Sequence, residues 1–318
     1  MEREYDISVV LGTYNRCELL PEAIESLLAQ EAGGVRYQIL LVDNNSTDRT
    51  RDTIEPYLAL GDSRLRYLFE SQQGVSHARN AGIRAALGTV IAFTDDDVRV
   101  SSSWVSELKN AFDLHPEVDY VGGKVMPRWR RAPPRWLTAE NWSPLALVDH
   151  GDTPFRTNSD HQVCLVGANL ALRRQVFDII GVFSPAFPRG QDHELQRRLW
   201  QAGREGLYAP QVVVTADVQT ERMERSYHRR WHRNEGREYA KLRHEQWETP
   251  GRRFLDVPLR LYKWAAVRFL QMVLAALRGK QSETFEHESC VWFLVGYVAQ
   301  RRADRRQAGG DEGIDGSL

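Results

Sequence analysis

Short apolar segments rich in β-branched residues alternate with amphipathic helical patterns through the first third of this 318-residue chain. Parallel strands need a connection that crosses one face of the sheet, and a helix supplies it. The alternation therefore predicts an α/β fold with a mainly parallel sheet and helices on both faces. The predicted strands are Ile7–Leu11, Gln38–Val42, Leu65–Phe69 and Val90–Phe93, and the predicted helices are Glu18–Gln30, Asp48–Ala59 and Val75–Leu87.

The fourth predicted strand is followed by three consecutive aspartates, Asp95, Asp96 and Asp97. Open α/β sheets bind ligands beyond the carboxyl ends of their strands. Adjacent carboxylates repel one another unless a cation lies between them, and hard oxygen ligands suit Mg²⁺ or Mn²⁺. The triplet therefore predicts a divalent metal site, although an isolated aspartate triplet would suggest only a solvated acidic turn.

The overall charge is almost balanced, because 42 basic residues accompany 43 acidic ones. Such a balance gives no electrostatic reason to expect nucleic acid as a partner. The three cysteines, Cys17, Cys164 and Cys290, are far apart and match no metal-ligand spacing, so we expect reduced thiols. The charged segment Met1–Asp6 leads directly into the first strand, so we expect no signal peptide. These features predict a cytoplasmic protein.

Beyond the aspartates the alternation is less regular, and a segment rich in tryptophan and proline, 127–161, interrupts it. Around this segment we expect helices at Trp104–Leu114 and Gln191–Gln201 and strands at Tyr120–Val125, Val163–Val166 and Gln211–Thr215. After Asp217 the sequence becomes helical and basic, and its last residues are rich in glycine and aspartate. We therefore predict an α/β domain at 1–218, with a nucleotide-binding half at 1–105 and an acceptor half at 106–218, then a helical region at 219–305 and a disordered tail at 306–318.

Six segments resemble, in order and in spacing, the successive sugar-nucleotide motifs of glycosyltransferase family 2. They are Ser8–Arg16, Val42–Asp48, Gly74–Gly82, Thr94–Asp97, Gly167–Asn169 and Gly190–Leu195. The resemblance covers residues 6–218. It implies a GT-A fold, a nucleoside diphosphate sugar donor linked to uridine, inversion of the anomeric centre, and synthesis of a surface glycan or glycolipid.

The resemblance also implies roles for individual residues. Thr13 and Asp43 would contact the nucleotide base, with Arg79 beside it. Asp95 would lie on the ribose side, and Asp97 would bind a Mn²⁺ or Mg²⁺ ion that acts as a Lewis acid on the leaving diphosphate, with Asp96 between them. From the residues alone, Asp43 could also be a turn residue and Arg79 part of a surface ion pair. The remaining implied donor-binding residues are Tyr14, Asn15, Arg16, Asn45, Gly74, Asn169 and Arg230.

Transfer to a hydroxyl needs a general base, and relatives carry an acidic pair at the start of a helix. Here that pair is Gln191-Asp192, so the resemblance assigns the base to Asp192 and leaves Glu194 as a weaker alternative. A helix N-cap is the simpler explanation of Asp192. Many relatives also place a metal-binding histidine where this chain has Ala216. Asp217, His228 or His232 are candidates to replace it.

Several aromatic and basic residues are candidates for contacts with the acceptor. Trp129 and Trp136 lie in the long loop, and Trp231 follows Arg230 in a segment similar to an Arg-Trp motif of processive sugar polymerases. Tyr227 stands where those enzymes have Gln, so transfer of a single sugar is favoured over polymerisation. The alternatives are that the tryptophans anchor the loop or the core and that the basic segment is a surface helix.

The most apolar part of the helical region, Phe254–Leu277, has its charges on a narrow helical face. This pattern predicts a helix at the membrane interface rather than across it, and Val291–Ala299 is too short to cross. The expected location is therefore peripheral, on the inner face of the cell membrane. A pair of helices that packs in the core or in a homodimer is the alternative.

Together these patterns predict a metal-dependent inverting glycosyltransferase acting on a saccharide or a lipid-linked acceptor. Transfer to a polyprenyl phosphate is one alternative. A non-catalytic sugar-nucleotide-binding subunit is another, suggested by Gln191 and Ala216. A Rossmann dehydrogenase is disfavoured because no glycine-rich fingerprint follows the first strand.

Overall fold

The computed structural model describes residues 5–187, 189–241 and 251–311 of the chain. These residues belong to two compact units. The sheet unit comprises Met1–Arg128 and Ala146–Asp217, and the helical unit comprises Trp129–Leu145 and Val218–Leu318. Part of the long tryptophan-rich loop, which we expected in the acceptor half of the α/β domain, therefore groups with the C-terminal helices.

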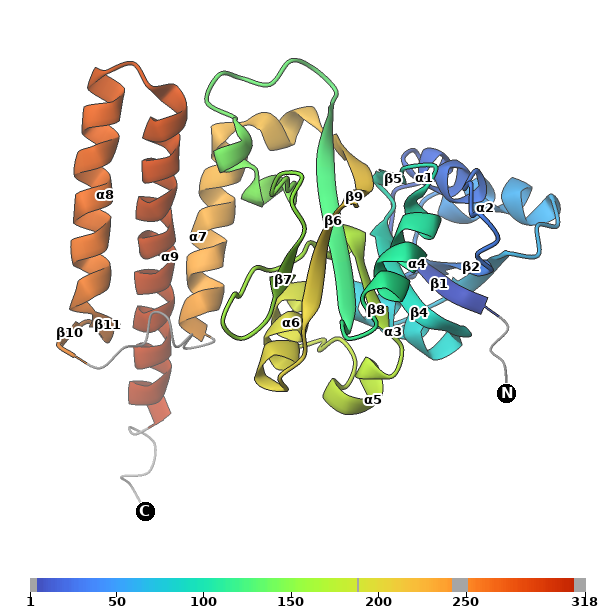
Figure 1. Cartoon of the computed structure of the whole chain (residues 1–318). Helices are drawn as coiled ribbons and strands as arrows, with labels where there is room; N and C mark the ends of the chain where they lie inside the picture. The colour runs from blue at the N-terminus through green and yellow to red at the C-terminus, as the bar shows by residue number, and fades with distance from the viewer. Residues whose placement is uncertain (1–4, 188, 242–250, 312–318) are drawn as a thin grey trace. The chain divides into compact units, whose positions relative to one another are not determined.

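The first half of the sheet unit contains four parallel strands in the order β3-β2-β1-β4 (Figure 1). The register pairs Thr13 with Asp43 and Gly12 with Asp95, so these residues meet at the same edge of the sheet. The strands are β1 (Tyr5–Thr13), β2 (Tyr37–Asp43), β3 (Leu65–Phe69) and β4 (Gly88–Asp95), and the connecting helices are α1 (Leu20–Leu28), α2 (Thr50–Ala59) and α3 (Val75–Ala85).

The second half extends the same sheet with antiparallel strands. After β4 the order continues β8-β6-β9-β5, and β7 pairs with β9. The elements are β5 (Val98–Val100), α4 (Trp104–Leu114), β6 (Tyr120–Trp129), β7 (Phe155–Thr157), β8 (Leu170–Arg173), α5 (Val176–Ile180), α6 (Gln191–Gln201) and β9 (Gly206–Val218). The predicted α/β class, with a C-terminal helical region, is confirmed.

One predicted strand, Val163–Val166, is wrong. The strand next to β4 is instead β8, which starts at Leu170 and follows a short 3₁₀ turn, Gly167–Asn169. The Gln196 side chain accepts a bond from the Leu165 N–H and donates one to its carbonyl, at 2.8 Å each. An amide side chain thus satisfies the backbone groups that a neighbouring strand would otherwise bond.

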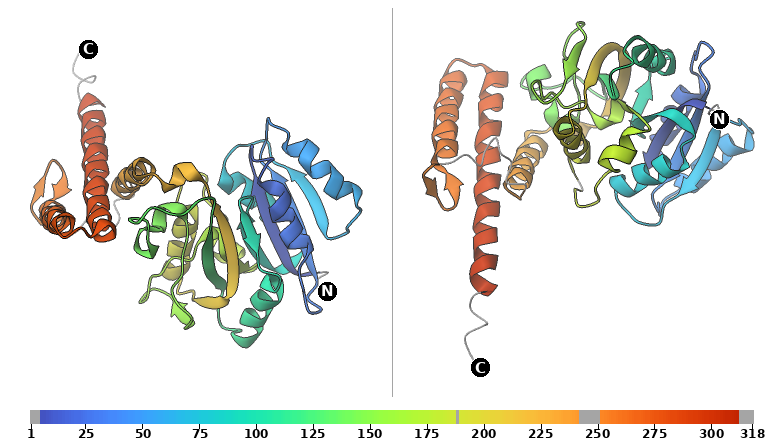
Figure 2. Two further views of the ribbon diagram at one scale, coloured as in Figure 1. Left: turned by 90° about the horizontal axis from the view of Figure 1, so that it is seen from above. Right: turned by 60° about the horizontal axis from the view of Figure 1, so that its bottom comes forward.

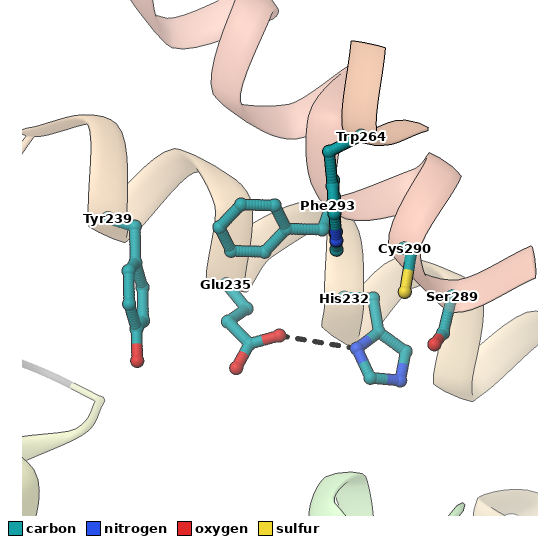
Figure 3. Close-up of a pocket in the computed structure, with 7 residues that line it drawn as sticks. All are labelled: His232, Glu235, Tyr239, Trp264, Ser289, Cys290 and Phe293. Carbon is teal, nitrogen blue, oxygen red and sulfur yellow. Dashed lines mark hydrogen bonds and ion pairs between the residues drawn. The ribbon is translucent and has the colours of Figure 1, made fainter. Parts of the chain in front are cut away.

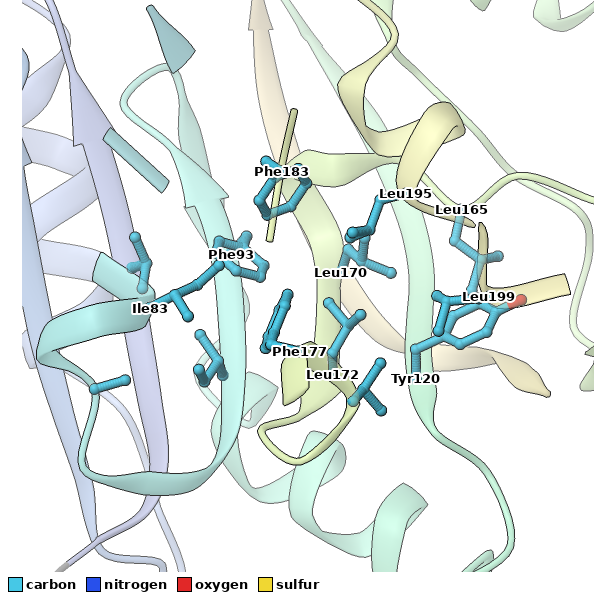
Figure 4. Close-up of a cluster of buried hydrophobic side chains, with 14 of the residues drawn as sticks. Ile83, Phe93, Tyr120, Leu165, Leu170, Leu172, Phe177, Phe183, Leu195 and Leu199 are labelled. Atoms are coloured by element: carbon cyan, nitrogen blue, oxygen red, sulfur yellow. The ribbon is translucent and has the colours of Figure 1, made fainter. Parts of the chain in front are cut away.

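A continuous apolar core joins β4, β8, α3 and α6 inside the sheet unit (Figure 4). The Phe93 ring lies edge-on to the rings of Phe183, at 5.2 Å, and Phe177, at 6.4 Å. Gly82 lets α3 approach β1 closely, because a side chain there would overlap Val10. This packing fixes α3, which carries Arg79, against the strands that carry the aspartates.

In its described residues, the helical unit has the long helices α7 (Arg225–Lys241), α8 (Leu259–Leu277) and α9 (Gln281–Asp311) and a short hairpin of β10 (Arg253–Phe254) and β11 (Val257–Pro258). Helices α8 and α9 lie side by side (Figure 2). Helices α7 and α9 are in backbone contact, because a side chain at Gly236 or Gly296 would overlap the opposite main chain. Residues 306–311 of the predicted tail lie in α9, and 312–318 lie outside the described residues.

Within the described part of the chain, no helix combines the length and the apolarity needed to cross a bilayer.

His228, in the core of the helical unit, generates a testable pH dependence. Its Nε2 lies 2.9 Å from the Arg222 carbonyl and must be the donor, while Nδ1 is buried without a partner among the described residues. The rings of Trp136, at 4.9 Å, and Phe285, at 5.8 Å, pack against it. Burial therefore lowers the pKa of His228 from its ordinary 6.5 to about 4.

As the pH falls below 6.5, the unfolded chain binds a proton that folded His228 excludes, so stability is lost progressively until about pH 4. We expect a loss of about 2 kcal/mol between pH 7 and pH 5 from this group. Urea unfolding of His228→Gln should lack this component, whereas His161→Gln, at an exposed histidine, should retain it. Equal pH slopes in wild type and His228→Gln would contradict the assignment.

Candidate active site

The aspartate triplet follows directly from the end of β4 in the sheet unit. Asp96 is buried, and its Oδ2 accepts a hydrogen bond of 2.8 Å from the Thr13 hydroxyl at the end of β1. One guanidinium nitrogen, Nη1 of Arg16, lies 3.0 Å from Asp96 Oδ1 and 2.7 Å from Asp97 Oδ2. The two carboxylates therefore share the guanidinium of Arg16.

The electrostatic consequence is clearest at Asp96. Burial raises the pKa of its carboxyl to about 7, and the charge of Asp97 adds to this effect. Arg16 acts in the opposite direction and favours the ionised form. A cation beside Asp96 therefore stabilises its ionised carboxylate against the cost of burial.

Asp95 has a different cationic partner. Nη2 of Arg79 lies 3.1 Å from Asp95 Oδ1, and the guanidinium lies against the rings of Phe93 and Phe183, at 5.7 and 5.3 Å from their centres. The second terminal nitrogen of Arg79, Nη1, is buried and has no partner among the described residues. A buried donor of this kind has unused capacity to bind a ligand.

Asp192 lies in the first turn of α6, where two backbone N–H groups orient its carboxylate. Oδ2 accepts a bond from Gly167 N and Oδ1 accepts one from His193 N, each at 3.0 Å. A Cβ placed on Gly167 would lie 2.7 Å from Arg79 Nη1 and 3.1 Å from Asp192 Oδ2. The structure thus brings the predicted base and the unpaired nitrogen of Arg79 together at one glycine.

Several predicted donor-binding residues hold the loops around this edge. Asn15, with a left-handed φ of 51°, accepts bonds from Thr47 N and Asp48 N at 2.7 and 3.2 Å. Asp43 accepts bonds from Ser46 N and from the Tyr67 hydroxyl, each at 3.0 Å.

Of the other predicted loop residues, Gly74 and Asn45 form hydrogen bonds within the protein, whereas Tyr14 is exposed. Gly74, with φ of 135°, is the N-cap residue just before α3 and donates its N–H to the Asn44 side chain. Asn45, also left-handed, donates to the Ser71 carbonyl. Tyr14 is exposed, so its ring is accessible for stacking on a base.

Asn169, another predicted donor-binding residue, is fully buried and engaged within the protein. Its amide donates to the carbonyls of Lys124 and Val212, and its Oδ1 accepts a bond from the indole of Trp104. These bonds tie β6 and β9 to α4. Asn169 therefore holds the framework of the sheet unit together, and its contact with the donor stays a prediction.

The position of the missing histidine lies close to the triplet in the sheet. Ala216 pairs with Val98, and Asp217 N donates to the Asp97 carbonyl. The Asp217 carboxylate forms ion pairs with Arg99, at 2.9 Å, and Arg128, at 2.5 Å. Within the described ranges, no three His, Cys, Asp or Glu side chains form a metal-binding group. No sequence pattern indicates Arg99 and Arg128 as partners of Asp217, because both are far from it along the chain.

The predicted acceptor residues divide between the two units. Trp136 is buried in the helical unit, where its ring packs against His228 and Phe285. Trp129 lies beside Trp142, Trp231 beside His232, and the Arg230 guanidinium lies 6.0 Å from the ring centre of Tyr227. In the sheet unit, Glu194 forms an ion pair with Arg198 at 2.8 Å.

A separate open pocket of ≈ 280 Å³ lies within the helical unit (Figure 3). The rings of Tyr239, Trp264 and Phe293 form its apolar part. His232 and Glu235, which lie 3.2 Å apart, form its polar edge together with Ser289 and Cys290.

Solved structures with similar folds define the architecture. Staphylococcus aureus TarS 1–349 in complex with UDP aligns over 95% of this chain and 92% of its own, with a TM-score of 0.54 and 15% identity. The mannosyltransferase PcManGT from Pyrobaculum calidifontis, in complex with GDP-Man and Mn²⁺, aligns over 100% and 80%, with a TM-score of 0.55 and 16% identity. The fold is thus the GT-A fold of glycosyltransferases.

The sequence comparisons give the family. The model of Glycosyl transferase family 2 matches residues 8–181, more than half of the chain. A glucosyl-dolichyl phosphate glucuronosyltransferase of Haloferax volcanii is 27% identical over 65% of this chain and 68% of its own. Glycosyltransferase AglE of the same organism is 26% identical over 65% of each chain. The chain belongs to glycosyltransferase family 2, and it spans about two thirds of the length of these two relatives.

The contact at Gly167 can be tested by adding one methyl group. Gly167→Ala should displace Arg79 or Asp192, because the new Cβ would lie within 3.1 Å of both side chains. Misplacement on this scale should lower kcat of sugar transfer by about 100-fold. Gly12→Ala is the matched control, since its Cβ would meet only an ordinary contact at 3.5 Å. Equal activity of the two variants would contradict the arrangement.

Proposed function

We propose that the chain transfers a single sugar from a uridine diphosphate sugar to a lipid-linked acceptor, with inversion, a divalent metal at Asp97 and Asp192 as general base. One observation supports this most directly: Asp192 and the unpaired nitrogen of Arg79 meet at Gly167, and Arg79 also bonds Asp95 of the triplet. A carboxylate base and a donor-binding cation are therefore adjacent.

The edge formed by β1, β2 and β4 suits the nucleotide. Thr13, Asp43 and Asp95 are neighbours there through the strand register. The exposed Tyr14 supplies an aromatic face, and the unpaired Arg79 Nη1 supplies a donor for an anionic oxygen. UDP in the TarS complex supports a uridine nucleotide, and GDP-Man in PcManGT marks the guanosine alternative.

The carboxylates of Asp96 and Asp97 fit a hard divalent cation. Both are oxygen donors, and both already converge on one cationic group, Arg16 Nη1. Asp97 would be the principal ligand. The ion, Mn²⁺ or Mg²⁺, would neutralise charge on the leaving nucleoside diphosphate. Mn²⁺ in the PcManGT complex supports this choice.

Asp192 would accept the proton of the attacking hydroxyl. Its two oxygens each accept one backbone bond, which fixes the carboxylate and leaves further lone pairs for the acceptor. Arg79 would orient the donor in two ways, by holding Asp95 and by donating a hydrogen bond from Nη1. The base and the leaving group would then act on opposite sides of the anomeric carbon, and the configuration would invert.

The name of the first Haloferax relative describes a lipid-linked sugar acceptor, which supports a similar acceptor here. A surface on α8 supports action at a membrane. Its outer stripe exposes Val267, Leu270, Val273, Leu274 and Leu277. Exposed basic residues flank this stripe: Arg260 and Lys263 before it, and Arg278 and Lys280 after it. Apolar residues between basic ends suit the interface of an anionic bilayer.

Replacement of the proposed base separates the two acceptor classes. Asp192→Asn should lower kcat by about 10²- to 10⁴-fold if a hydroxyl must be deprotonated. Glu194→Gln, which breaks only the ion pair with Arg198, should change kcat far less. Initial rates measured by release of nucleoside diphosphate would decide. Nearly full activity of Asp192→Asn would favour a polyprenyl phosphate acceptor, and the opposite ranking would move the base to Glu194.

The membrane proposal predicts binding to vesicles. The wild type should cosediment with vesicles containing phosphatidylglycerol and less with pure phosphatidylcholine. Leu270→Glu combined with Leu274→Glu should weaken binding more than tenfold, because two apolar contacts are replaced by charges. Leu114→Glu, at an exposed leucine of the sheet unit, is the control. A wild type that ignores vesicles and forms a dimer in solution would assign the stripe to a dimer contact.

A further inference from the structure

We propose that Arg16 is an internal counter-ion that occupies the cation position between Asp96 and Asp97 until the donor's diphosphate draws it away. Free Mn²⁺ would then bind weakly, and diphosphate and metal would bind together. The inference rests on the proposed metal site.

The geometry supports this role because a single atom serves both carboxylates. Arg16 Nη1 lies 3.0 Å from Asp96 Oδ1 and 2.7 Å from Asp97 Oδ2. A divalent ion bound to these two oxygens would compete with this nitrogen for them. The Thr13 hydroxyl bonds the other oxygen of Asp96, so that carboxylate has a fixed orientation before any metal binds.

Arg16 is more exposed to solvent than the two carboxylates with which it pairs. The side chain of Arg16 is 34% exposed, whereas those of Asp96 and Asp97 are 6% and 11% exposed. Arg16 is therefore the most solvent-accessible of the three side chains. A metal arriving alone must displace it and leave it without a buried partner.

A diphosphate changes this balance. Its oxygens can coordinate the metal and can also pair with the guanidinium, which binds phosphate groups bidentately. The displaced Arg16 then gains a new anionic partner, while the metal gains ligands beyond the two carboxylates. Because coupling between ligands is reciprocal, the nucleotide should raise metal affinity by the same factor as the metal raises nucleotide affinity.

Arg79 provides the internal comparison. It also neutralises an aspartate of the triplet, Asp95, at 3.1 Å. However, its side chain is only 5% exposed, and it packs against the rings of Phe93 and Phe183. Arg79 is therefore held in place, whereas Arg16 can move toward solvent. The two arginines carry the same charge beside one aspartate triplet, but Arg16 pairs with Asp96 and Asp97 whereas Arg79 pairs with Asp95.

The test measures Mn²⁺ binding by electron paramagnetic resonance of free Mn²⁺, with and without UDP, in wild type and two variants. Arg16→Gln should bind Mn²⁺ about tenfold more tightly than wild type without nucleotide, and UDP should improve its affinity less than it improves that of wild type.

Arg79→Gln is the control, and its Mn²⁺ affinity should stay near that of wild type without nucleotide, because Arg79 pairs with Asp95. Arg16→Lys, which keeps the charge, should lie between wild type and Arg16→Gln, and melting curves check folding.

The possible failures are distinguishable. If Arg16→Gln and wild type bind Mn²⁺ equally without nucleotide, the counter-ion role is overturned and the proposed metal site survives. If Arg79→Gln strengthens Mn²⁺ binding as much as Arg16→Gln does, the effect is one of general charge and the role is also overturned. If no variant binds Mn²⁺ even with UDP, both the metal site and this inference fail.

Discussion

Neutralisation of three adjacent aspartates is the constraint on which the site depends. Three carboxylates at the end of one buried strand repel one another, and each has a cationic partner supplied by another element. Arg79 on α3 pairs with Asp95, and Arg16 after β1 pairs with both Asp96 and Asp97. Without these cations the edge of the sheet would be destabilised by unpaired buried charge. The site is therefore assembled by electrostatic compensation as much as by the strand register.

The parallel strand register places residues from distant sequence motifs at one edge of the sheet. Thr13, Asp43 and Asp95 come from three separate strands, yet in-register pairing aligns their ends. The antiparallel extension then brings Gly167, just before β8, beside the same edge, where Asp192 meets Arg79. The parallel strands carry the residues proposed to bind the nucleotide, and the antiparallel half carries the carboxylate proposed as the base.

The sequence was most informative where local periodicity and tertiary structure agree. The strands before the triplet and their helices were predictable because each is a regular apolar or amphipathic pattern. The strand predicted at Val163–Val166 failed because the bonds of Leu165 go to the Gln196 side chain, which no local pattern records. The roles of Asn169 and Asp217 were equally hidden. Their partners, Trp104 for the first and Arg99 and Arg128 for the second, are distant in sequence, and only the fold brings them together.

In the helical unit, some apolar residues pack between the helices and others, on α8, are exposed. Contact between α7 and α9 is secured by Gly236 and Gly296, which allow the two backbones to touch, and by a small core around Phe293 and Tyr297. Helix α8 adds Leu261 and Ala265 to its packing side and leaves Leu270 and Leu277 outside. Because the internal packing does not use these outer leucines, their apolar character is not explained by the stability of the unit. The proposed contact with an anionic bilayer would account for these exposed leucines, and the flanking basic residues would favour a surface of that charge.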